Sequence, residues 1–576
     1  MEERDPGIER NFIIFMILVM VSIFGWMYFM GKKTPPKPGE QKSAVEEKAP
    51  EVSKPAPELN KPIGGAPAPA LPSPPLPTVS SPVTEEKTVV VTSPLYRVIF
   101  TNQGAVPKSW ELLKYQDQVY FPYEISLKWP PLKKIDKIEP GPIQLIPPEF
   151  AGKLPLRSKI RVNGFEINPE TLWQTDSEDL MLETGSGQLV FSLPLSEGAV
   201  LKKIYTFYPD QYRSELKIEY FGLEPDPKLS EVDFDLSYRF EPLSRLSRIN
   251  FHGPIFHTGK KLVKFTLKDL DKNKMLTEST VDWGGFTDSY FLTALLAPPD
   301  NPMSAQAYYA GGEEQLSDKK SIKEYGLELK FKPSVRVLSN HSLAQLELYF
   351  GPKEKNLLEK TRNTLGLAID YGMWAPIAIP LMYALIYTNK VVKNFGWAIV
   401  ILTIILRMAM FPLTRKGQKS MKELQKLQPE MDKIRKKYPD DKMKQQEEIY
   451  AMQKKYKINP MGGCLPMLVQ IPIFFAFYKV LLVSIELRHA PWILWIPDLS
   501  SRDPLLILPL LMGVSQFVMQ KLTPTTGDPM QARMMMMMPL VFTFMLIYFP
   551  SGLLLYWTVS NLIGIGQQIY VNKTMK

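Results

Sequence analysis

Six runs of apolar residues, each close to the length that crosses a lipid bilayer, constrain this chain most. A helix needs about 20 mostly apolar residues to span roughly 30 Å of hydrocarbon. The runs cover residues 12–30, 395–413, 467–485, 505–519, 534–549 and 553–570, and the last three are short or interrupted. We therefore predict a membrane protein with about six spans, although 22% of all residues are charged.

The run at residues 12–30 has two interpretations. A cleaved secretory signal has an apolar region of roughly 7 to 15 residues, followed by a small-residue cleavage site. This run is longer, and the sequence GKKTPPKPG that follows it has no such site. We therefore interpret residues 1–30 as a retained N-terminal transmembrane anchor.

The next two segments differ sharply in composition. Residues 31–86 are rich in Pro, Ala, Lys and Glu, as in APAPALPSPPLPTVSSP, so they can neither bury a core nor pair as strands. We predict a disordered linker. Residues 87–355 alternate apolar and polar positions, with Leu216, Ile218 and Tyr220 on one face. Many short strands broken by turns predict an all-β sandwich domain.

Two further helical segments flank the apolar run at 395–413. Within the region 356–393, residues 371–393 combine aromatic side chains, proline and lysines, which favours an amphipathic interfacial helix over a span. Residues 415–457 place apolar side chains at spacings of three and four on either side of a YPDD turn, which predicts a helical hairpin. Pro429 should kink its first arm. A solvated hairpin without a partner is the alternative to a docking surface.

Basic residues predict the orientation of the chain. The hairpin at 415–457 is the most basic loop, and cytoplasmic loops carry an excess of Lys and Arg. A cytoplasmic hairpin places both termini in the cytoplasm and residues 87–355 outside the membrane. The flanks of the first run disagree weakly, because Lys32, Lys33 and Lys37 then lie outside.

Arg407 is a charged residue inside an apolar run. It lies about six residues, or about 9 Å, from the cytoplasmic end of that run. An arginine at mid-membrane costs roughly 2.5 to 3.5 kcal/mol on insertion scales, so it usually faces protein or water. The alternative is that its side chain extends toward the lipid headgroups.

Polar residues in the other runs favour a shared cavity around this arginine. Each one alone more often makes a hydrogen bond between helices. No Asp or Glu occurs in any of the six runs. A buried cation without a counter-charge needs water, so we predict a wet cavity that opens to the cytoplasm. The candidate residues are Arg407, Thr403, Gln470, Ser515, Gln516, Tyr556, Trp557, Ser560 and Asn561.

Several classes of function have little support in the sequence. Cys464 is the single cysteine, the four histidines show no zinc-binding spacing, and no glycine-rich phosphate loop occurs, so we expect no metal, cofactor or enzyme activity. A solute transporter or channel would normally show an internal repeat and ionisable pairs in its spans. An intramembrane protease needs a nucleophile and a base, but Ser551 follows a proline and no span contains histidine.

Several segments together resemble a known family. ILRMAMFPLT, INPMGGCLPMLVQIPIFFAFY, QKLTPTTGDPMQ and FPSGLLLYWTVSNLIGIGQQ are similar to the membrane core of the YidC/Oxa/Alb family of membrane protein insertases. WGGFTDSYFLTALLAP, from Trp283, resembles the periplasmic domain of its Gram-negative members. The resemblance implies a multi-domain inner membrane protein, with a five-helix insertase core over 394–576, the N-terminal anchor, and a periplasmic β-supersandwich similar to galactose mutarotases.

The resemblance also implies a function. Members insert and fold integral membrane proteins without ATP, alone or with the Sec translocon (SecYEG and SecDF), through a hydrophilic groove open to cytoplasm and lipid. Arg407 and Thr403 match the groove arginine and the threonine one turn before it. Tyr556 and Trp557 match an aromatic pair that is often two tyrosines, so Trp557 departs from the pattern. The implied partners are nascent membrane proteins, the lipid bilayer, and a ribosome or signal-recognition receptor at the hairpin, with no nucleic acid bound directly.

Overall fold

The computed structural model describes residues 85–574, interrupted by short gaps. The predicted anchor at 1–30 and nearly all of the predicted linker at 31–86 lie outside the described residues. The gaps are 126–131, 136–138, 147–154, 196–197, 223–224, 241–250, 260, 266–269, 271–274, 317–319, 333–337, 339–340, 440, 457–464 and 524–528.

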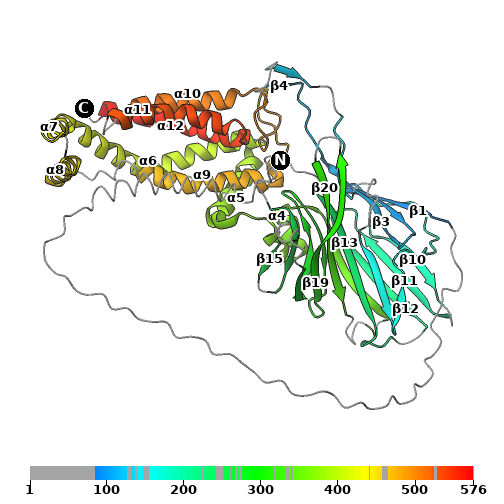
Figure 1. Cartoon of the computed structure of the whole chain (residues 1–576). Helices are drawn as coiled ribbons and strands as arrows, with labels where there is room; N and C mark the ends of the chain where they lie inside the picture. The colour runs from blue at the N-terminus through cyan, green and yellow to red at the C-terminus, as the bar shows by residue number, and fades with distance from the viewer. Residues whose placement is uncertain are drawn as a thin grey trace, which may run out of the picture.

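The chain divides into a β-rich part and a helical part. Strands lie between residues 88 and 352, and the helices follow from residue 355 onward. Figure 1 shows the long helices lying beside one another, with the sheets gathered at one end and α7 (Gln428–Lys437) and α8 (Lys442–Lys455) at the other.

In the described part of the chain, the strands form three large sheets and one small hairpin. The eight-stranded sheet has the order β10 (Gly187–Pro194), β11 (Val200–Phe207), β12 (Arg213–Phe221), β21 (Ser342–Pro352), β18 (Phe291–Leu296), β17 (Trp283–Thr287), β14 (Gly253–His257), β15 (Leu262–Lys264). The six-stranded sheet has the order β16 (Leu276–Val281), β19 (Met303–Leu316), β20 (Lys320–Phe331), β13 (Glu231–Phe240), β7 (Arg157–Val162), β8 (Phe165–Ile167).

The five-stranded sheet has the order β6 (Pro142–Ile146), β3 (Val106–Gln116), β2 (Tyr96–Thr101), β1 (Thr88–Thr92), β9 (Leu180–Met181). The hairpin pairs β4 (Tyr123–Ile125) with β5 (Leu132–Lys134).

The sheets share one hydrophobic core. On β12 the predicted alternation is observed, because Leu216, Ile218 and Tyr220 are buried while the residues between them are half-buried. Trp110 of β3 stacks on Phe350 of β21 with ring centroids 4.5 Å apart, which joins the five-stranded sheet to the eight-stranded sheet. The result is a β-sandwich in which apolar side chains of several sheets interdigitate.

The helical part begins with short connecting helices and continues as long apolar helices. The helix α12 packs on α6, α10 and α9, while α11 packs on α10, and α5 packs on α6 and α9. The segments are α4 (Lys355–Thr361), η3 (Asn363–Ala368), η4 (Gly372–Trp374), α5 (Ala375–Val392), α6 (Phe395–Lys426), α9 (Leu465–Val483), η6 (Ile485–Leu487), α10 (Ile507–Leu522), α11 (Pro529–Leu546) and α12 (Ser551–Thr574).

Helix length and composition can be compared with the predicted spans. Among the described residues, Gly372–Val392 and Phe395–Lys426 are long and apolar enough to cross a membrane, and Leu468–Val483, Ile507–Leu522 and Met536–Leu546 are shorter apolar helices. These criteria do not separate an interfacial helix at 371–393 from a span, so the interfacial position stays a prediction.

The predicted hairpin is built from the end of α6 together with α7 and α8. A small hydrophobic cluster joins its two arms: Leu424, Leu427, Met431 and Met452. Pro429 does not bend a continuous helix. Instead α6 ends at Lys426, and α7 begins at Gln428 with the proline in its first turn, where a missing N–H costs no hydrogen bond.

The β domain contacts the loop between α9 and α10 directly. Ile125 N donates to Pro504 O at 2.8 Å, and Arg488 Nη2 donates to Asp117 O at 3.0 Å. Glu486 of η6 is half-buried in this junction, and burial raises the pKa of its carboxyl to about 7, with a smaller contribution from the nearby Glu354 carboxylate. The folded state is therefore more stable when this carboxyl is protonated and neutral.

The junction should therefore lose stability as the pH rises. The folded-state pKa of Glu486, about 7, lies above its ordinary value of 4.5, so the folded form is penalised progressively from about pH 4.5 to pH 7. The full penalty is about 3 kcal/mol. We expect the melting temperature of the purified chain to fall between pH 5 and pH 8, and Glu486→Gln to flatten that fall. Glu423→Gln, on an exposed side chain, serves as the control. Identical pH profiles for Glu486→Gln and the unmodified protein would contradict the assignment.

Candidate functional site

Arg407 of α6 faces α12. Its Nε donates to Ser560 Oγ at 2.6 Å, and Gln567 Nε2 donates to the Arg407 carbonyl at 3.2 Å. Gly564 of α12 lies beside the guanidinium, where a Cβ would be in ordinary contact, 3.9 Å from Arg407 Cζ. Among the described residues, no carboxylate pairs with Arg407, and its side chain is only half-buried. The charge is therefore held by a neutral hydroxyl.

Two further polar links connect α12 to its neighbours. Gln470 Nε2 of α9 donates to the Tyr556 hydroxyl. On the other side, Asn561 Nδ2 donates to Ser515 Oγ of α10 at 3.1 Å, and both side chains are buried. Buried polar groups in apolar surroundings need such partners, so these links fix how α9 and α10 sit against α12.

Trp557 occupies a position between three helices. Its Nε1 donates to Gln516 Oε1 of α10 at 3.3 Å. Its ring contacts Phe474 of α9 and Phe542 of α11, with centroids 4.9 Å and 5.8 Å away. Both phenylalanines lie among other aromatic residues of their apolar runs, so the sequence carried no signal that marked these two.

Thr403 is placed differently from the other candidates. It is fully buried, and its hydroxyl donates to the Ile399 carbonyl of its own helix at 2.6 Å. A threonine in a helix commonly bonds back to the preceding turn in this way. The structure therefore joins Arg407 and Ser560 directly, links Gln470 to Tyr556, Ser515 to Asn561 and Gln516 to Trp557, and leaves the Thr403 hydroxyl outside these links.

The helices expose apolar side chains and bury polar ones. On α12, Ser560 and Asn561 are 2% and 3% exposed, whereas the neighbouring Leu562 is 57% exposed. Val514 of α10 and Phe544 of α11 are 63% and 62% exposed. A protein in water shows the opposite arrangement, but hydrocarbon favours apolar outer surfaces and satisfied polar groups inside.

No metal site is evident in the described part of the chain, where no group of three or more His, Cys, Asp or Glu side chains converges. The linked side chains around α12 comprise hydrogen-bond donors and acceptors and the Arg407 cation.

A helical core with this surface and a β-sandwich domain at one end define an integral membrane protein with a large domain outside the bilayer. A family model described as "60Kd inner membrane protein" matches residues 387–576, and one described as "YidC periplasmic domain" matches residues 133–384. The chain belongs to the YidC family of membrane protein insertases.

Relatives of similar length support this assignment. The "Membrane protein insertase YidC" of Syntrophus aciditrophicus is 36% identical over 492 residues, which cover 85% of each chain. That of Geotalea daltonii is 33% identical and covers 98% of this chain and 99% of its own. A solved structure titled "Active YidC insertase crystal structure with the first transmembrane domain resolved" covers 85% of this chain and 94% of that chain, at 19% identity and a TM-score of 0.35, so the assignment depends on the sequence relatives.

The function follows from the family. The chain is an inner membrane protein with a periplasmic domain that inserts other proteins into the membrane, and the family is not one of enzymes.

Proposed function

We propose that the polar links around Arg407 form the surface that receives a client chain. The observation that carries this proposal is a half-buried arginine held by Ser560 and not by a carboxylate. Such a cation can still attract an anionic group, whereas one in a buried ion pair is already compensated. The half-buried Arg407, Gln470, Gln516 and Trp557 are the contact residues. The buried residues of the groove support them from behind: Tyr556, Ser560, Asn561, Ser515 and Thr403.

In the proposed mechanism, a polar, often acidic, segment of the client enters a groove open to the cytoplasm and to lipid. Water and Arg407 reduce the cost of bringing that segment partway across the bilayer. The client's apolar segment leaves between α9 and α11, beside Trp557. Removing apolar surface from water supplies roughly 25 cal/mol per Å² as the driving force, so no ATP is needed.

We also propose the orientation and the domain boundaries. The hairpin and the β domain lie at opposite ends of the helices, and the C-terminal end of α12 lies beside α7 (Figure 1). Lys422 Nζ donates to the carbonyls of Val571 and Asn572 at 3.3 Å and 3.1 Å, which ties that end to the hairpin arm. This arrangement supports a cytoplasmic hairpin with the C-terminus beside it. From the sequence pattern we propose a cytoplasmic N-terminus and domains at 1–30, 31–86, 87–355, 356–393 and 394–576.

The partners we propose follow from that orientation. The basic hairpin faces the ribosome or the signal-recognition receptor, and the helical core acts alone or beside the Sec translocon (SecYEG and SecDF). The clients are nascent membrane proteins, and no nucleic acid is bound directly.

Site-specific photocrosslinking to a stalled nascent chain tests the client surface. A photoreactive residue at Gln470 or Gln516, both half-buried, should crosslink to the client's translocated segment. The matched control is Leu562, which lies on the opposite, exposed side of α12 and should crosslink to lipid. Equal crosslinking of the client from Leu562 and from the two glutamines would contradict the proposal that this surface receives the client.

A further inference from the structure

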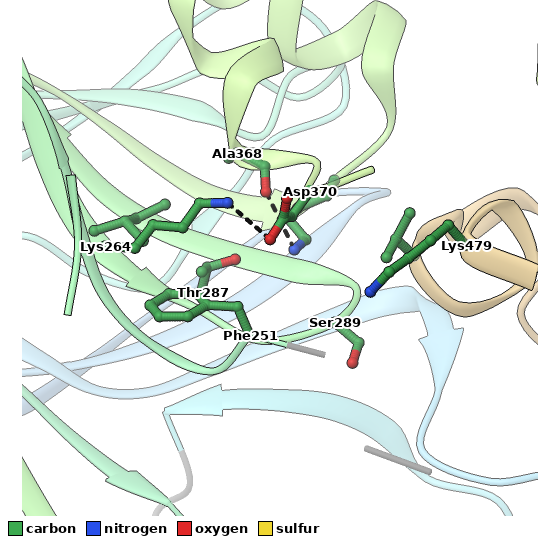
Figure 2. A pocket seen from close by; sticks show the side chains of 10 residues that line it. Phe251, Lys264, Thr287, Ser289, Ala368, Asp370 and Lys479 are labelled. Carbon is green, nitrogen blue, oxygen red and sulfur yellow. Dashed lines mark hydrogen bonds and ion pairs between the residues drawn. The ribbon is translucent and has the colours of Figure 1, made fainter. Parts of the chain in front are cut away.

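The β domain docks on the outer end of α9 around a small, nearly filled pocket. Lys264 Nζ pairs with Asp370 Oδ2 at 2.8 Å. Lys353 Nζ, which also lines the pocket, donates to the Asp288 carbonyl at 2.5 Å. Figure 2 shows Lys264 and Asp370 on one side of the pocket and Lys479 of α9 on the other. The space between them holds about one water molecule, so the β domain is packed closely on this end of the helices.

A narrow ribbon projects from the β domain toward α10. Its described residues are 117–125 and 132–135, which include the β4–β5 hairpin, and we call them the outer ribbon. At its base, Asp117 N donates to Gly141 O at 3.0 Å, and Gly141 N donates to Asp117 Oδ1 at 3.0 Å. Figure 1 shows β4 beside the outer end of α10, apart from the three large sheets. The outer ribbon therefore brings residues of the β domain to the edge of the membrane core.

Two contacts set the level of the outer ribbon relative to the bilayer. Ile125 N donates to Pro504 O at 2.8 Å. The Glu124 carboxylate pairs with the Arg502 guanidinium. Pro504 lies three residues before α10 begins at Ile507, and the end of a span marks the border between hydrocarbon and headgroups. The β4 strand therefore lies at the level of the outer headgroups.

A tryptophan pair marks the same border on α6. Trp397 lies in the first turn of α6, at the outer end of that helix, and is 45% exposed. Its ring centroid lies 5.8 Å from that of Trp492 in the outer loop, residues 484–506 between α9 and α10. Tryptophan is enriched where spans leave the bilayer. The loop that holds the outer ribbon is therefore an interfacial loop.

The outer ribbon carries a concentration of aromatic side chains. Tyr120, Phe121 and Tyr123 fall within four consecutive residues, and no residue between 117 and 125 is buried. The Tyr120 hydroxyl donates to the Ile135 carbonyl at 3.4 Å, which joins the two chain segments of the ribbon. Exposed aromatic residues gathered on one element mark a surface that meets a membrane or another protein.

The hairpin has one face that points away from the outer loop. Side chains alternate along a strand, and Glu124 points toward Arg502, so Tyr123 points the other way. Tyr123 is 44% exposed. Lys134 of β5 is directly opposite Tyr123 and is also exposed, and residues paired in this way share a face. The free face therefore combines an aromatic ring with an ammonium group.

We propose that the outer ribbon lies on the outer leaflet of the bilayer, with its aromatic rings among the headgroups and Lys134 at the phosphates of anionic phospholipids. Tyrosine has an apolar ring and a polar hydroxyl, so it suits the border between hydrocarbon and water. A lysine near anionic lipid gains from the negative surface potential. Lipid is favoured over a protein partner because the contacts with the outer loop hold the ribbon at headgroup level, where lipid surrounds the core. This contact is separate from the surface that receives the client.

Fluorescence quenching in nanodiscs of phosphatidylglycerol and phosphatidylcholine tests the contact. An environment-sensitive fluorophore is attached to Tyr123→Cys of the full chain, in which Cys464→Ser removes the native thiol. We expect lipids with a nitroxide on the headgroup to quench this label several times more strongly than a label at Met181→Cys. Met181 of β9 is 70% exposed and lies next to β1, on the side of the β domain away from the helices (Figure 1). Equal quenching at the two positions would overturn the proposal.

The role of the charge is tested with the label kept at residue 123. Lys134→Gln should shift the equilibrium between quenched and unquenched label about fivefold toward the unquenched state in discs that contain phosphatidylglycerol. The same substitution should have little effect in discs of phosphatidylcholine alone. The matched control is Lys159→Gln, which removes an exposed lysine of β7 outside the ribbon. Identical quenching with Lys134→Gln and Lys159→Gln in both kinds of disc would overturn the assignment of Lys134 to anionic lipid.

A protein partner would give a different result. The label at residue 123 would then be reached by iodide in nanodiscs as readily as the label at residue 181. It would become shielded only in whole membranes, together with a crosslink to a second protein. That outcome would overturn the assignment of the ribbon to lipid.

Discussion

Insertion of clients with acidic translocated segments is expected to fall about tenfold when Arg407 is replaced by alanine. The guanidinium is the charge that the apolar run of α6 presents to the polar side chains of α12, and Ser560 holds it without neutralising it. Losing a charge-assisted contact with a client carboxylate costs about 1.4 kcal/mol, which is a factor of ten in an equilibrium. The measurement is protease protection of clients in vesicles reconstituted with the purified chain.

Matched variants separate the charge from other effects of this substitution. Arg415→Ala removes an exposed arginine from the same helix and should leave insertion unchanged. Arg407→Lys keeps the charge and should retain most of the activity on acidic clients. Clients whose translocated segments lack acidic residues should insert equally well with all these variants. If Arg407→Ala inserts every client at the normal rate, the charge has no required role.

Gly285→Ala should destabilise the β domain by about 3 kcal/mol or more. Gly285 of β17 lies opposite Ala294 of β18, and a Cβ at Gly285 would lie 1.9 Å from the Thr293 carbonyl oxygen. That neighbour is backbone in a paired strand, so it cannot move aside without breaking the sheet. The expected result is a large drop in the melting temperature of the full chain and rapid proteolysis within residues 85–352.

The adjacent residue provides the control. A Cβ at Gly284 would meet Leu329 Cδ2 at 3.0 Å, which is the end of a flexible side chain that can rotate away. Gly284→Ala should therefore change stability by less than about 1 kcal/mol, and the loss of glycine entropy in the unfolded chain offsets part of that. Equal melting temperatures for the two variants would show that the β17–β18 contact is not tight.

Much of the helical part could be predicted from residue pattern. The apolar runs at 395–413, 467–485, 505–519, 534–549 and 553–570 correspond to α6, α9, α10, α11 and α12, with ends that differ by a few residues. One difference is larger, because α6 continues beyond its apolar run to Lys426 and becomes the first part of the hairpin arm. A change from apolar to charged residues ends a membrane span but does not end a helix, so hydropathy alone could not place that boundary.

Pairings between helices could not be predicted in the same way. Gln516 and Asn561 were recognisable as polar residues in apolar surroundings, but their partners Trp557 and Ser515 depend on how α10 packs on α12. Thr403 and Arg407 share one face of α6, yet the threonine bonds within its own helix. Nothing in the sequence around Lys479 indicated that this side chain lines the same pocket as Lys264 and Lys353, which lie more than 100 residues earlier.

The sequence by itself determined which segments form helices and which form strands. Periodicity and the length of apolar runs are local properties, and they decide how each segment is solvated by water or lipid. The sequence also showed that Arg407 has no acidic partner in the apolar runs. Only the tertiary structure decided which polar groups meet, and that it brings Lys264, Lys353 and Lys479 into one pocket. The reason is that hydrogen bonds and charge clusters depend on distances of a few ångströms, which packing sets between segments far apart in the chain.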